Sequence, residues 1–337
     1  GVFITKSGKV NFVDLAGSEM TKKTLSEGKT LEEANNINNN SNVVLDPTIV
    51  NTSARYIQQR CQELLQYAQI PQLFLVLDGV RCPLKTVTHD QREERRIENL
   101  RLARCAQGAS ASFEKYKACI RIPAALAHAV ALRVAAHFST TNKIELVWSP
   151  YEADAQLVYL ARTQQVRAIV TEDSDVLVYA AAASASTAST GDIHILYKLQ
   201  RQNGNCDVLN LNWLLNDIET APNSNNNNNQ KSSRKTTSGL EPYLQAFQQR
   251  QRLDPGKGIR CFVQACVLTG CDYRINQLHG IGLVQAFKQV HLALAQEHDL
   301  RLWHILRRQL SHKATRNVEN LHEYARGLRQ CEAVFYY

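Results

Sequence analysis

Acidic side chains directly follow three short apolar runs of this chain. They are Asp78 after residues 73–77, Glu152 and Asp154 after residues 144–148, and Asp173 and Asp175 after residues 168–171. Apolar runs of this length are typical of buried parallel strands, whose carboxyl ends meet at one edge of a sheet. Ligands of open parallel sheets bind beyond that edge. We therefore expect these carboxylates to converge around one solvent-accessible pocket.

Several carboxylates in one pocket require either raised pKa values or a compensating cation. Two like charges about 4 Å apart repel by about 4 kcal/mol at an effective dielectric constant of about 20. Neither His nor Cys stands beside these five acids in the sequence. Oxygen ligands alone favour a hard ion, Mg²⁺ or Mn²⁺. More than four carboxylates indicate a pair of ions, the arrangement that serves in-line hydrolysis of phosphodiesters.

Each acid also has a purely structural interpretation. Asp78-Gly79 is a common turn sequence, and residues 171–175 fit a solvated loop. Ser149 and Glu152 fit a helix capping box in which Ser149 is the N-cap. The capping box leaves Asp154 unexplained. The joint placement of acids after three apolar runs therefore favours a site over three unrelated loops.

The elements that would position these acids are strands that alternate with helices. The predicted strands are residues 10–13, 73–77, 144–148, 168–171 and 193–197, and the predicted helices between them are residues 53–68, 92–107, 124–138 and 151–162. This alternation predicts an α/β fold with a mainly parallel sheet covered by helices on both faces. The later part of the chain is predicted to be helical, over residues 240–251, 258–269, 282–294 and 299–311.

Composition narrows the class of partner. The 337 residues carry a formal net charge of +8, which favours polyanionic partners. No apolar run approaches the roughly 20 residues that span a bilayer, so no membrane partner is expected. Nine cysteines without a C-x-x-C pair indicate a reducing compartment. The Asn-rich residues 35–42 and 223–239, and the weak stretch 181–190, are expected to be loops or insertions that do not pack.

Four motifs in a fixed order carry a family resemblance. The resemblance to the flap endonuclease/xeroderma G superfamily, and within it to the exonuclease 1 branch, covers about residues 55–337 and rests on LVLDG (75–79), SPYEADAQLVYL (149–160), IVTEDSDVLVY (169–179) and TGCDYRINQLHGIGLVQA (269–286). It implies a 5′ nuclease-like (PIN) fold with a helical arch over residues 81–121 and a helix–two-turn–helix over residues 258–294. It also implies a nuclear enzyme that uses two Mg²⁺ ions, for which Mn²⁺ can substitute. Its substrates would be DNA with 5′ ends, flaps, nicks or gaps.

The resemblance assigns roles to individual positions. The family's metal-binding and catalytic acids correspond to Asp78, Glu152, Asp154, Asp173, Asp175 and Asp272. Lys85 and Arg92 match the two cations of the arch that contact the scissile phosphate, and the neighbouring Arg95 and Arg96 are expected to bind DNA. The remaining charges of residues 81–121 fit a solvated helix with ion pairs along its surface.

Two glycines precede the predicted helix 282–294. Gly280 and Gly282 would let backbone N–H groups approach a phosphate at the positive end of that helix, although a plain structural turn explains the same spacing. In the family this turn binds the backbone of duplex DNA beside a K⁺ ion, and Thr269 and Ile281 correspond to residues of that site. Asn276 or Gln277 stands where the family has a serine ligand.

The opening of the chain departs from the family. Residues 8–38, with DLAGSE (14–19), resemble the switch II region of a kinesin motor domain, yet the sequence contains no nucleotide-binding P-loop. The family's opening motif and its first metal-ligand Asp are not recognisable there. Asp14 ends the apolar run before it and is the candidate replacement. We expect residues 1–42 to be a poorly integrated part of a chimeric gene model.

Three parts and three hypotheses follow. The expected parts are residues 1–42, a nuclease part at 43–180 and a second nuclease part at 181–337. The leading hypothesis is a structure-specific 5′ nuclease. The alternatives are a catalytically impaired DNA-junction-binding protein and a kinesin-derived microtubule-associated fragment. Residues 333–337 resemble the end of the family's catalytic core, so protein partners are expected to bind a C-terminal tail beyond them.

Overall fold

The computed structural model describes most of the chain from residue 45 onward. The described residues are 45–67, 70–105, 115–119, 122–141, 143–185, 193–201, 203–210, 239–273 and 277–336. The kinesin-like residues 1–42, with Asp14 and the predicted strand 10–13, lie outside them, as do residues 223–238 of the Asn-rich insertion.

The chain forms two compact units. Unit 1 contains the described residues up to Cys82, together with Thr88–Asp173 and Leu196–Cys206. Unit 2 contains Pro83–Val87, Ser174–Ile195 and the described residues from Asp207 onward. Each unit is therefore built from segments that are not contiguous in the sequence.

The first sheet is a parallel pair of strands in unit 1. β1 (Leu73–Leu77) is entirely buried and pairs in parallel with β2 (Ile144–Trp148), with Leu77 opposite Trp148. An uninterrupted apolar run suits a strand that is covered on both faces. Because the two strands run in the same direction, the residues that follow Leu77 and Trp148 emerge at the same edge of the sheet.

The second sheet has three short strands. They are β3 (Ala168–Thr171), β4 (His194–Tyr197) and β5 (Asp207–Asn210), in that order. The alternation of elements predicted one sheet, whereas the described residues form two. The apolar pattern indicates which residues are strands but not which strands pair, because pairing is decided by packing across the whole fold.

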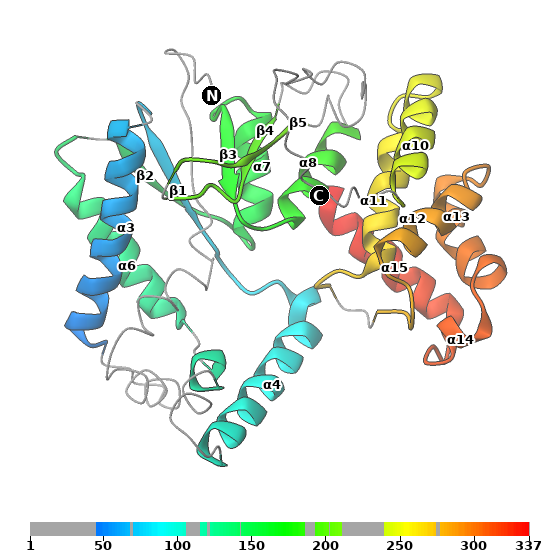
Figure 1. Ribbon diagram of the computed structural model, residues 1–337, viewed down its shortest axis with the longest axis horizontal. Helices are drawn as coiled ribbons and strands as arrows, with labels where there is room; N and C mark the ends of the chain where they lie inside the picture. The colour runs from blue at the N-terminus through cyan, green and yellow to red at the C-terminus, as the bar shows by residue number, and fades with distance from the viewer. Residues whose placement is uncertain are drawn as a thin grey trace, which may run out of the picture. The chain divides into compact units, whose positions relative to one another are not determined.

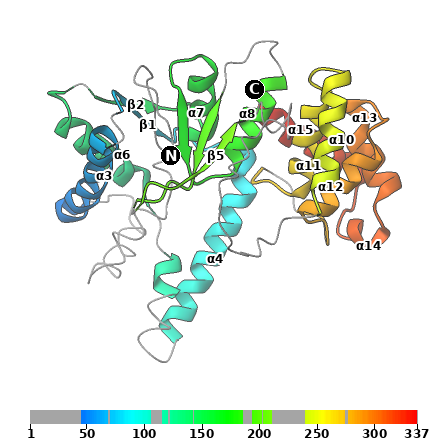
Figure 2. The same ribbon diagram turned by 45° about the horizontal axis from the view of Figure 1, so that its top comes forward.

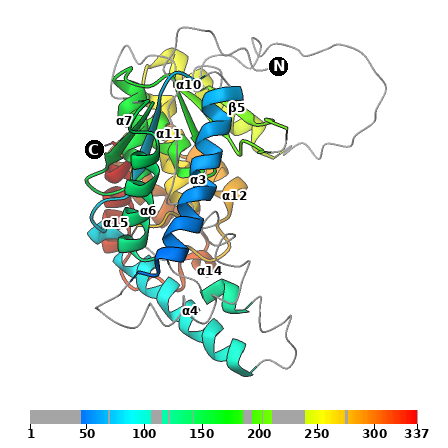
Figure 3. The same cartoon turned by 90° about the vertical axis from the view of Figure 1, so that its left-hand side faces the viewer.

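Helices cover the core of unit 1. α3 (Pro47–Tyr67) and α6 (Ala124–His137) lie side by side (Figures 1 and 3), and their apolar residues share a buried cluster with β1. α7 (Ala153–Arg162) follows β2 and packs against β1 and β3. α4 (Thr86–Cys105) points away from β1 and β2 (Figure 2), and only Ala103 in it is a buried apolar residue. This helix therefore presents most of its side chains to solvent.

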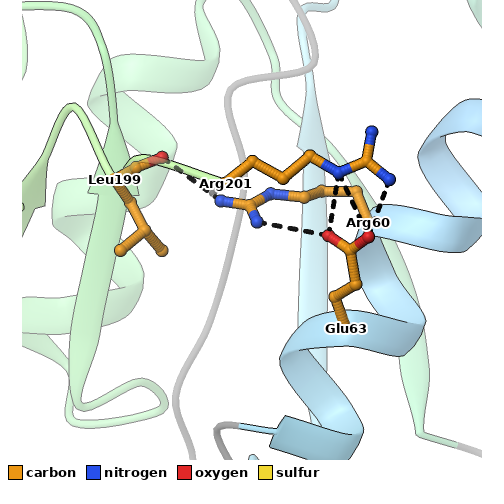
Figure 4. Close-up of polar contacts among 4 residues, drawn as sticks. All are labelled: Arg60, Glu63, Leu199 and Arg201. Atoms are coloured by element: carbon orange, nitrogen blue, oxygen red, sulfur yellow. Dashed lines mark hydrogen bonds and ion pairs between the residues drawn. The ribbon is translucent and has the colours of Figure 1, made fainter. Parts of the chain in front are cut away.

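A charged cluster joins α3 to the segment after β4 (Figure 4). Glu63 on α3 accepts hydrogen bonds from Arg201 Nη2 at 2.7 Å and from Arg60 Nη1 at 3.4 Å. Arg60 also donates from Nη2 to the carbonyl oxygen of Leu199 at 3.2 Å. The hydrogen bond from Arg201 is the largest cause that holds the pKa of Glu63 below its ordinary value. The cluster ties together parts of unit 1 that lie 138 residues apart in the chain.

The helix α11 (Lys257–Thr269) is central to unit 2. Its neighbours (Figures 1 and 2) are α8 (Asp175–Ala185), α10 (Glu241–Leu253), α12 (Leu283–Leu292) and α15 (Leu321–Tyr336). α10 and α11 approach closely, because a Cβ atom on Gly258 would lie 2.1 Å from the carbonyl oxygen of Phe247. Three further elements follow α12 in the sequence and precede α15: α13 (His298–His304), the π-helical η2 (Ile305–Gln309) and the short α14 (His312–Thr315).

Apolar patterning located most elements to within a few residues. β1, β2 and β3 have the predicted bounds, whereas the predicted helix 92–107 begins earlier, at Thr86. The expectation that residues 181–190 do not pack is wrong for their first half, because α8 extends to Ala185 and buries Ala181 and Ala182. Alanine has the highest helix propensity and its small side chain allows close packing. None of the described helices is long and apolar enough to cross a membrane.

Candidate active site

Asp78, directly after β1, lies against the first turn of α7. Its Oδ1 accepts a hydrogen bond at 2.8 Å from the backbone N–H of Ala153, which stands between Glu152 and Asp154. Ala153 is the first residue of α7, where N–H groups lack intrahelical partners and a negative charge is favourable. The fold thus brings Asp78 to the backbone that carries two of the other predicted acids.

Backbone contacts hold the loop before α7 against the end of β1. The N–H of Gly79 donates to the carbonyl of Tyr151 at 2.7 Å. A Cβ atom at Gly79 would lie 1.8 Å from the carbonyl oxygen of Ser149, so this approach requires glycine. Ser149 is buried and its hydroxyl donates to the carbonyl of Leu77 at 2.5 Å. The capping-box interpretation is therefore wrong, because α7 begins at Ala153 and Ser149 bonds to β1 instead.

The acids after β3 divide between the two units. Asp173 is exposed in unit 1, and its backbone N–H donates to Thr171 Oγ1 at 2.9 Å. Asp175 begins α8 in unit 2, where burial, and to a smaller extent the charge of Asp175, raises the pKa of Cys266 to about 12. The convergence of all six acids on one pocket involves both units and stays a prediction.

Lys85 and Asp272 form an ion pair in unit 2. Lys85 is buried at the end of a 3₁₀ turn (η1, Pro83–Lys85), and its Nζ lies 3.7 Å from Asp272 Oδ2. The same Nζ lies 4.8 Å from the centre of the fully buried Tyr273 ring, whose hydroxyl is hydrogen-bonded to the hydroxyl of Tyr179. A carboxylate and an aromatic face both stabilise an ammonium group. Sequence reasoning did not identify Tyr273 as a support of this pair, although it directly follows Asp272.

Two thiols stand close to this ion pair. The Cys331 thiol donates to the carbonyl of Tyr273 at 2.9 Å, and the Cys271 thiol approaches the same oxygen at 3.9 Å. The interaction between the Cys271 and Cys331 side chains is the largest cause that lowers the pKa of Cys271, while burial and the carboxylates of Asp175 and Asp272 act in the opposite direction. Sequence reasoning missed both thiols, and the only signal for Cys271 was its position beside Asp272.

The predicted DNA-binding cations of α4 have different surroundings. Arg92 and Arg95 are exposed. Arg96 is partly buried and forms an ion pair with Glu93, three residues earlier. Burial is the largest cause that lowers the pKa of Arg96, followed by the charge of Arg81. The ion-pair interpretation of this helix thus describes Arg96, while DNA contacts by Arg92 and Arg95 stay predictions.

The two glycines predicted to meet DNA lie before α12. Gly280 has a φ of 73°, a left-handed conformation that favours glycine. Gly282 is the N-cap of α12, and no described atom beyond its own and those of its two chain neighbours lies within 4 Å of where its Cβ would stand. Both residues are exposed, which suits the approach of a phosphate to the start of this helix. The DNA contact itself stays a prediction.

The two residues predicted to bind K⁺ already share a hydrogen-bond donor. Gln277 Nε2 donates to the carbonyl of Thr269 at 2.6 Å and to the carbonyl of Ile281 at 3.2 Å. Carbonyl oxygens only accept, so the nitrogen and not the oxygen of the amide faces them. A K⁺ ion between these two oxygens therefore does not fit the residues present. Asn276, the other residue at the family's serine position, lies outside the described residues.

The acids suit a hard divalent cation by donor type. All six are carboxylates, and Asp78 and Asp173 are exposed. Within the described residues, no group of three or more His, Cys, Asp or Glu side chains is placed so that it could hold a metal ion. Carboxylates without a cation between them repel one another, so a closed ligand cage is not expected before an ion binds. The donor chemistry fits Mg²⁺, and the described side chains do not form a complete cage.

Comparisons with known proteins find similarity to nucleases. Residues 143–272 match the family model described as XPG I-region. Exonuclease 1 of Drosophila melanogaster is 27% identical over 288 residues, which cover 83% of this chain and 31% of the fly protein. Exonuclease 1 of Arabidopsis thaliana is 28% identical over 236 residues, which cover 69% of this chain and 25% of the plant protein. The chain thus spans less than a third of the length of these relatives.

Two further similarities are shorter or more remote. Exodeoxyribonuclease 1 of Schizosaccharomyces pombe is 36% identical over 121 residues, which cover 35% of this chain and 20% of the yeast protein. Among solved structures, the catalytic core of Rad2 in complex with DNA substrate aligns with a TM-score of 0.47 and 18% identity, over 98% of this chain and 73% of that chain.

Proposed function

We propose that this chain, which carries an XPG I-region and is related to exonuclease 1 proteins, is a divalent-metal-dependent 5′ nuclease that hydrolyses DNA phosphodiesters at or near a 5′ end. The observation that carries the proposal is the hydrogen bond from Ala153 to Asp78. Asp78 lies outside the matched region 143–272, yet its carboxylate accepts a hydrogen bond from the backbone of Ala153, which stands between Glu152 and Asp154 inside that region. This contact supports a site that includes Asp78 together with acids of the matched region.

Each group of side chains has a role in this proposal. Asp78, Glu152, Asp154 and Asp173 of unit 1 and Asp175 and Asp272 of unit 2 would be ligands of divalent ions. Bound Mg²⁺ would supply a water of lowered pKa and stabilise negative charge on the phosphate. Lys85 and Arg92 would bind the phosphate that reacts. The pairing of Lys85 with Asp272 and Tyr273 fixes its ammonium group in advance, which favours electrostatic stabilisation of a transition state.

A DNA-binding protein that does not cleave is the second candidate. The net charge of +8 would support binding without any catalysis, because affinity for DNA comes mainly from contacts between basic residues and phosphates. The kinesin-related hypothesis concerns residues 1–42 alone, and we do not propose it because the sequence has no P-loop.

The test is cleavage of 5′-flap and 5′-recessed DNA by the full chain with and without Mg²⁺. Asp173→Ala is expected to slow Mg²⁺-dependent cleavage by about a hundredfold or more, since it removes a ligand that acts on the transition state. DNA binding should persist, and the backbone bond from residue 173 to Thr171 remains available in the variant.

Glu172→Ala is the matched control, because Glu172 is an exposed acid beside Asp173 without a proposed role. We expect it to retain cleavage. Unchanged turnover in Asp173→Ala would remove that residue from the site. Tight DNA binding by the unmodified chain without any cleavage in Mg²⁺ or Mn²⁺ would establish the second candidate instead.

A further inference from the structure

Two backbone carbonyl groups before α12 point at one side-chain nitrogen. The Nε2 atom of Gln277 lies 2.6 Å from the oxygen of Thr269 and 3.2 Å from the oxygen of Ile281. Both oxygens carry partial negative charge, so they repel each other unless a donor or a cation stands between them. In this chain the donor is the amide of Gln277.

The position of these carbonyl groups would also suit a cation. Thr269 is the last residue of α11, where carbonyl groups lack intrahelical partners and the helix dipole is negative. Ile281 is buried, and its N–H donates to the carbonyl of Leu278 at 3.3 Å, which fixes the orientation of the turn. The two oxygens thus form a place for positive charge that the chain fills with an amide.

The surrounding backbone is shaped around the Gln277 side chain. Gly270, the C-cap of α11, has a φ of 124°, a backbone conformation that residues other than glycine rarely adopt. A Cβ atom there would lie 3.4 Å from both Cγ and Cδ of Gln277. The glutamine chain therefore lies across Gly270 at van der Waals distance. This packing and the two hydrogen bonds orient the side chain toward the two carbonyl groups although Gln277 is an exposed residue.

We propose that the Gln277 amide takes the place of a monovalent cation in this turn, so that the turn holds its shape without K⁺. An amide carries no net charge, so the turn would offer a phosphate its backbone N–H groups and no bound cation. The consequence that DNA binding is independent of K⁺ rests on the proposed function. The consequence for the stability of the turn does not.

The first experiment measures binding of the full chain to a 5′-recessed duplex, with EDTA present to prevent cleavage. The Kd is compared in potassium chloride and in choline chloride at the same ionic strength, because choline is too large to enter between two carbonyl oxygens. We expect the two values to agree within about twofold, well below the tenfold that corresponds to about 1.4 kcal/mol. Binding that is fivefold or more tighter in potassium chloride would overturn the proposal.

The second experiment converts the donor into an acceptor. In Gln277→Glu, a carboxylate faces the two carbonyl oxygens, and this set of oxygen ligands would require a cation. We expect the Kd of this variant for DNA to be about fivefold lower in potassium chloride than in choline chloride. This ratio corresponds to about 1 kcal/mol, the net contribution of one typical hydrogen bond. Gln249→Glu, an equal charge change at an exposed position of α10, should show no K⁺ response. If Gln277→Glu also shows no response, the proposal is wrong.

Thermal unfolding supplies a readout that does not need DNA. The unfolding temperature of the unmodified chain should be the same in both salts, whereas that of Gln277→Glu should rise in potassium chloride. Gln277→Ser, which removes the amide and leaves space, should behave like Gln277→Glu and replaces it if the latter does not fold. A chain that binds no DNA in either salt refutes the proposed function, and the unfolding temperatures then decide the cation question alone. Stabilisation of the unmodified chain by K⁺ would overturn the inference even where DNA binding is normal.

Discussion

Lys85 and Arg92 are assigned to the same phosphate, but their surroundings differ. Lys85 is buried between Asp272 and the ring of Tyr273, whereas Arg92 is exposed on α4. A buried ammonium is fixed in position and adds to the stability of the fold, because its removal takes a compensating charge away from the carboxylate beside it. An exposed guanidinium is adjustable and contributes little to stability. One assigned role therefore leads to two different expectations.

Lys85→Ala and Arg92→Ala should each slow single-turnover cleavage more than they weaken DNA binding, since both are assigned to the phosphate at which charge develops. Only Lys85→Ala should also lower the free energy of unfolding, by about 1–3 kcal/mol, because Asp272 loses its cation. Urea unfolding and single-turnover kinetics measure the two effects. Lys85→Met keeps the apolar stem and separates the loss of charge from the loss of packing. A matched fall in affinity, with cleavage of bound DNA unchanged, would return both residues to the ordinary basic surface.

At the residue scale, sequence motifs identified candidate side chains better than their partners. Asp78 stood out because it ends an apolar run, and its contact with Ala153 follows from parallel pairing of β1 and β2. The hydrogen bonds of Ser149 and Gln277 were not predictable. A hydroxyl or an amide can bond to many groups, and the choice depends on which backbone the fold brings near.

Among the elements, the end of β1 is the most tightly constrained. Gly79 leaves room for the carbonyl of Ser149 and thereby lets the loop before α7 lie against β1. This close approach places Asp78 at the start of α7. The position of Asp78 relative to α7 thus depends on the absence of a side chain at Gly79.

Gly79→Ala should lower the free energy of unfolding by about 3 kcal/mol and reduce cleavage, because its Cβ would push the loop away from β1. Circular dichroism in urea and a cleavage assay measure the two effects. Gly282→Ala is the control for stability, since space is open at that position and its φ of −92° suits alanine. If Gly79→Ala unfolds at the same urea concentration as the unmodified chain, the close contact at this turn is not rigid.

The Glu63 cluster makes a pH-dependent contribution to unit 1. The pKa of Glu63 is lowered in the fold, so its contribution is present above the ordinary value of 4.5 and is lost as pH falls through the lowered pKa. Glu63→Gln should therefore cost about 1 kcal/mol at neutral pH and progressively less in acid. Urea unfolding at a series of pH values measures the difference. Glu94→Gln, at an exposed position of α4, should show no difference at any pH. A deficit in Glu63→Gln that does not shrink in acid would show that the contribution is not ionic.

Elements were predictable where their apolar pattern was strong. β1, β2, β3 and α6 are recognisable because local burial dictates their residue types. The ends of helices were less predictable. The capping-box interpretation of α7 was wrong because the first N–H group of this helix, that of Ala153, donates to Asp78 after β1. The helix α8 was not predicted, and an alanine-rich stretch such as its second half looks the same in sequence whether it packs or not.

At the scale of the whole molecule, the chain is a basic protein of two interleaved units. The predicted boundary at residue 180 falls inside α8. In the structure the chain passes from unit 1 to unit 2 after Asp173, and shorter segments of each unit lie within the sequence of the other. Local sequence patterns do not show which unit a short segment belongs to, because that is decided by contacts between residues that are distant in the sequence. The motifs that carry the family resemblance are consequently spread over both units.

This interleaving limits how the protein can be divided by cloning. The chain passes from one unit to the other after Cys82, Val87, Asp173, Ile195 and Cys206. A fragment that stops at Asp173 would lack Arg201 and would leave Glu63 without its strongest partner. A fragment that keeps unit 1 intact must extend to Cys206, and one that keeps unit 2 intact must begin at or before Pro83, so each also contains segments of the other unit. A truncation that ends between Asp173 and Leu196 therefore removes part of unit 1 as well as all later residues, and point substitutions are the better tool for mapping activity in this molecule.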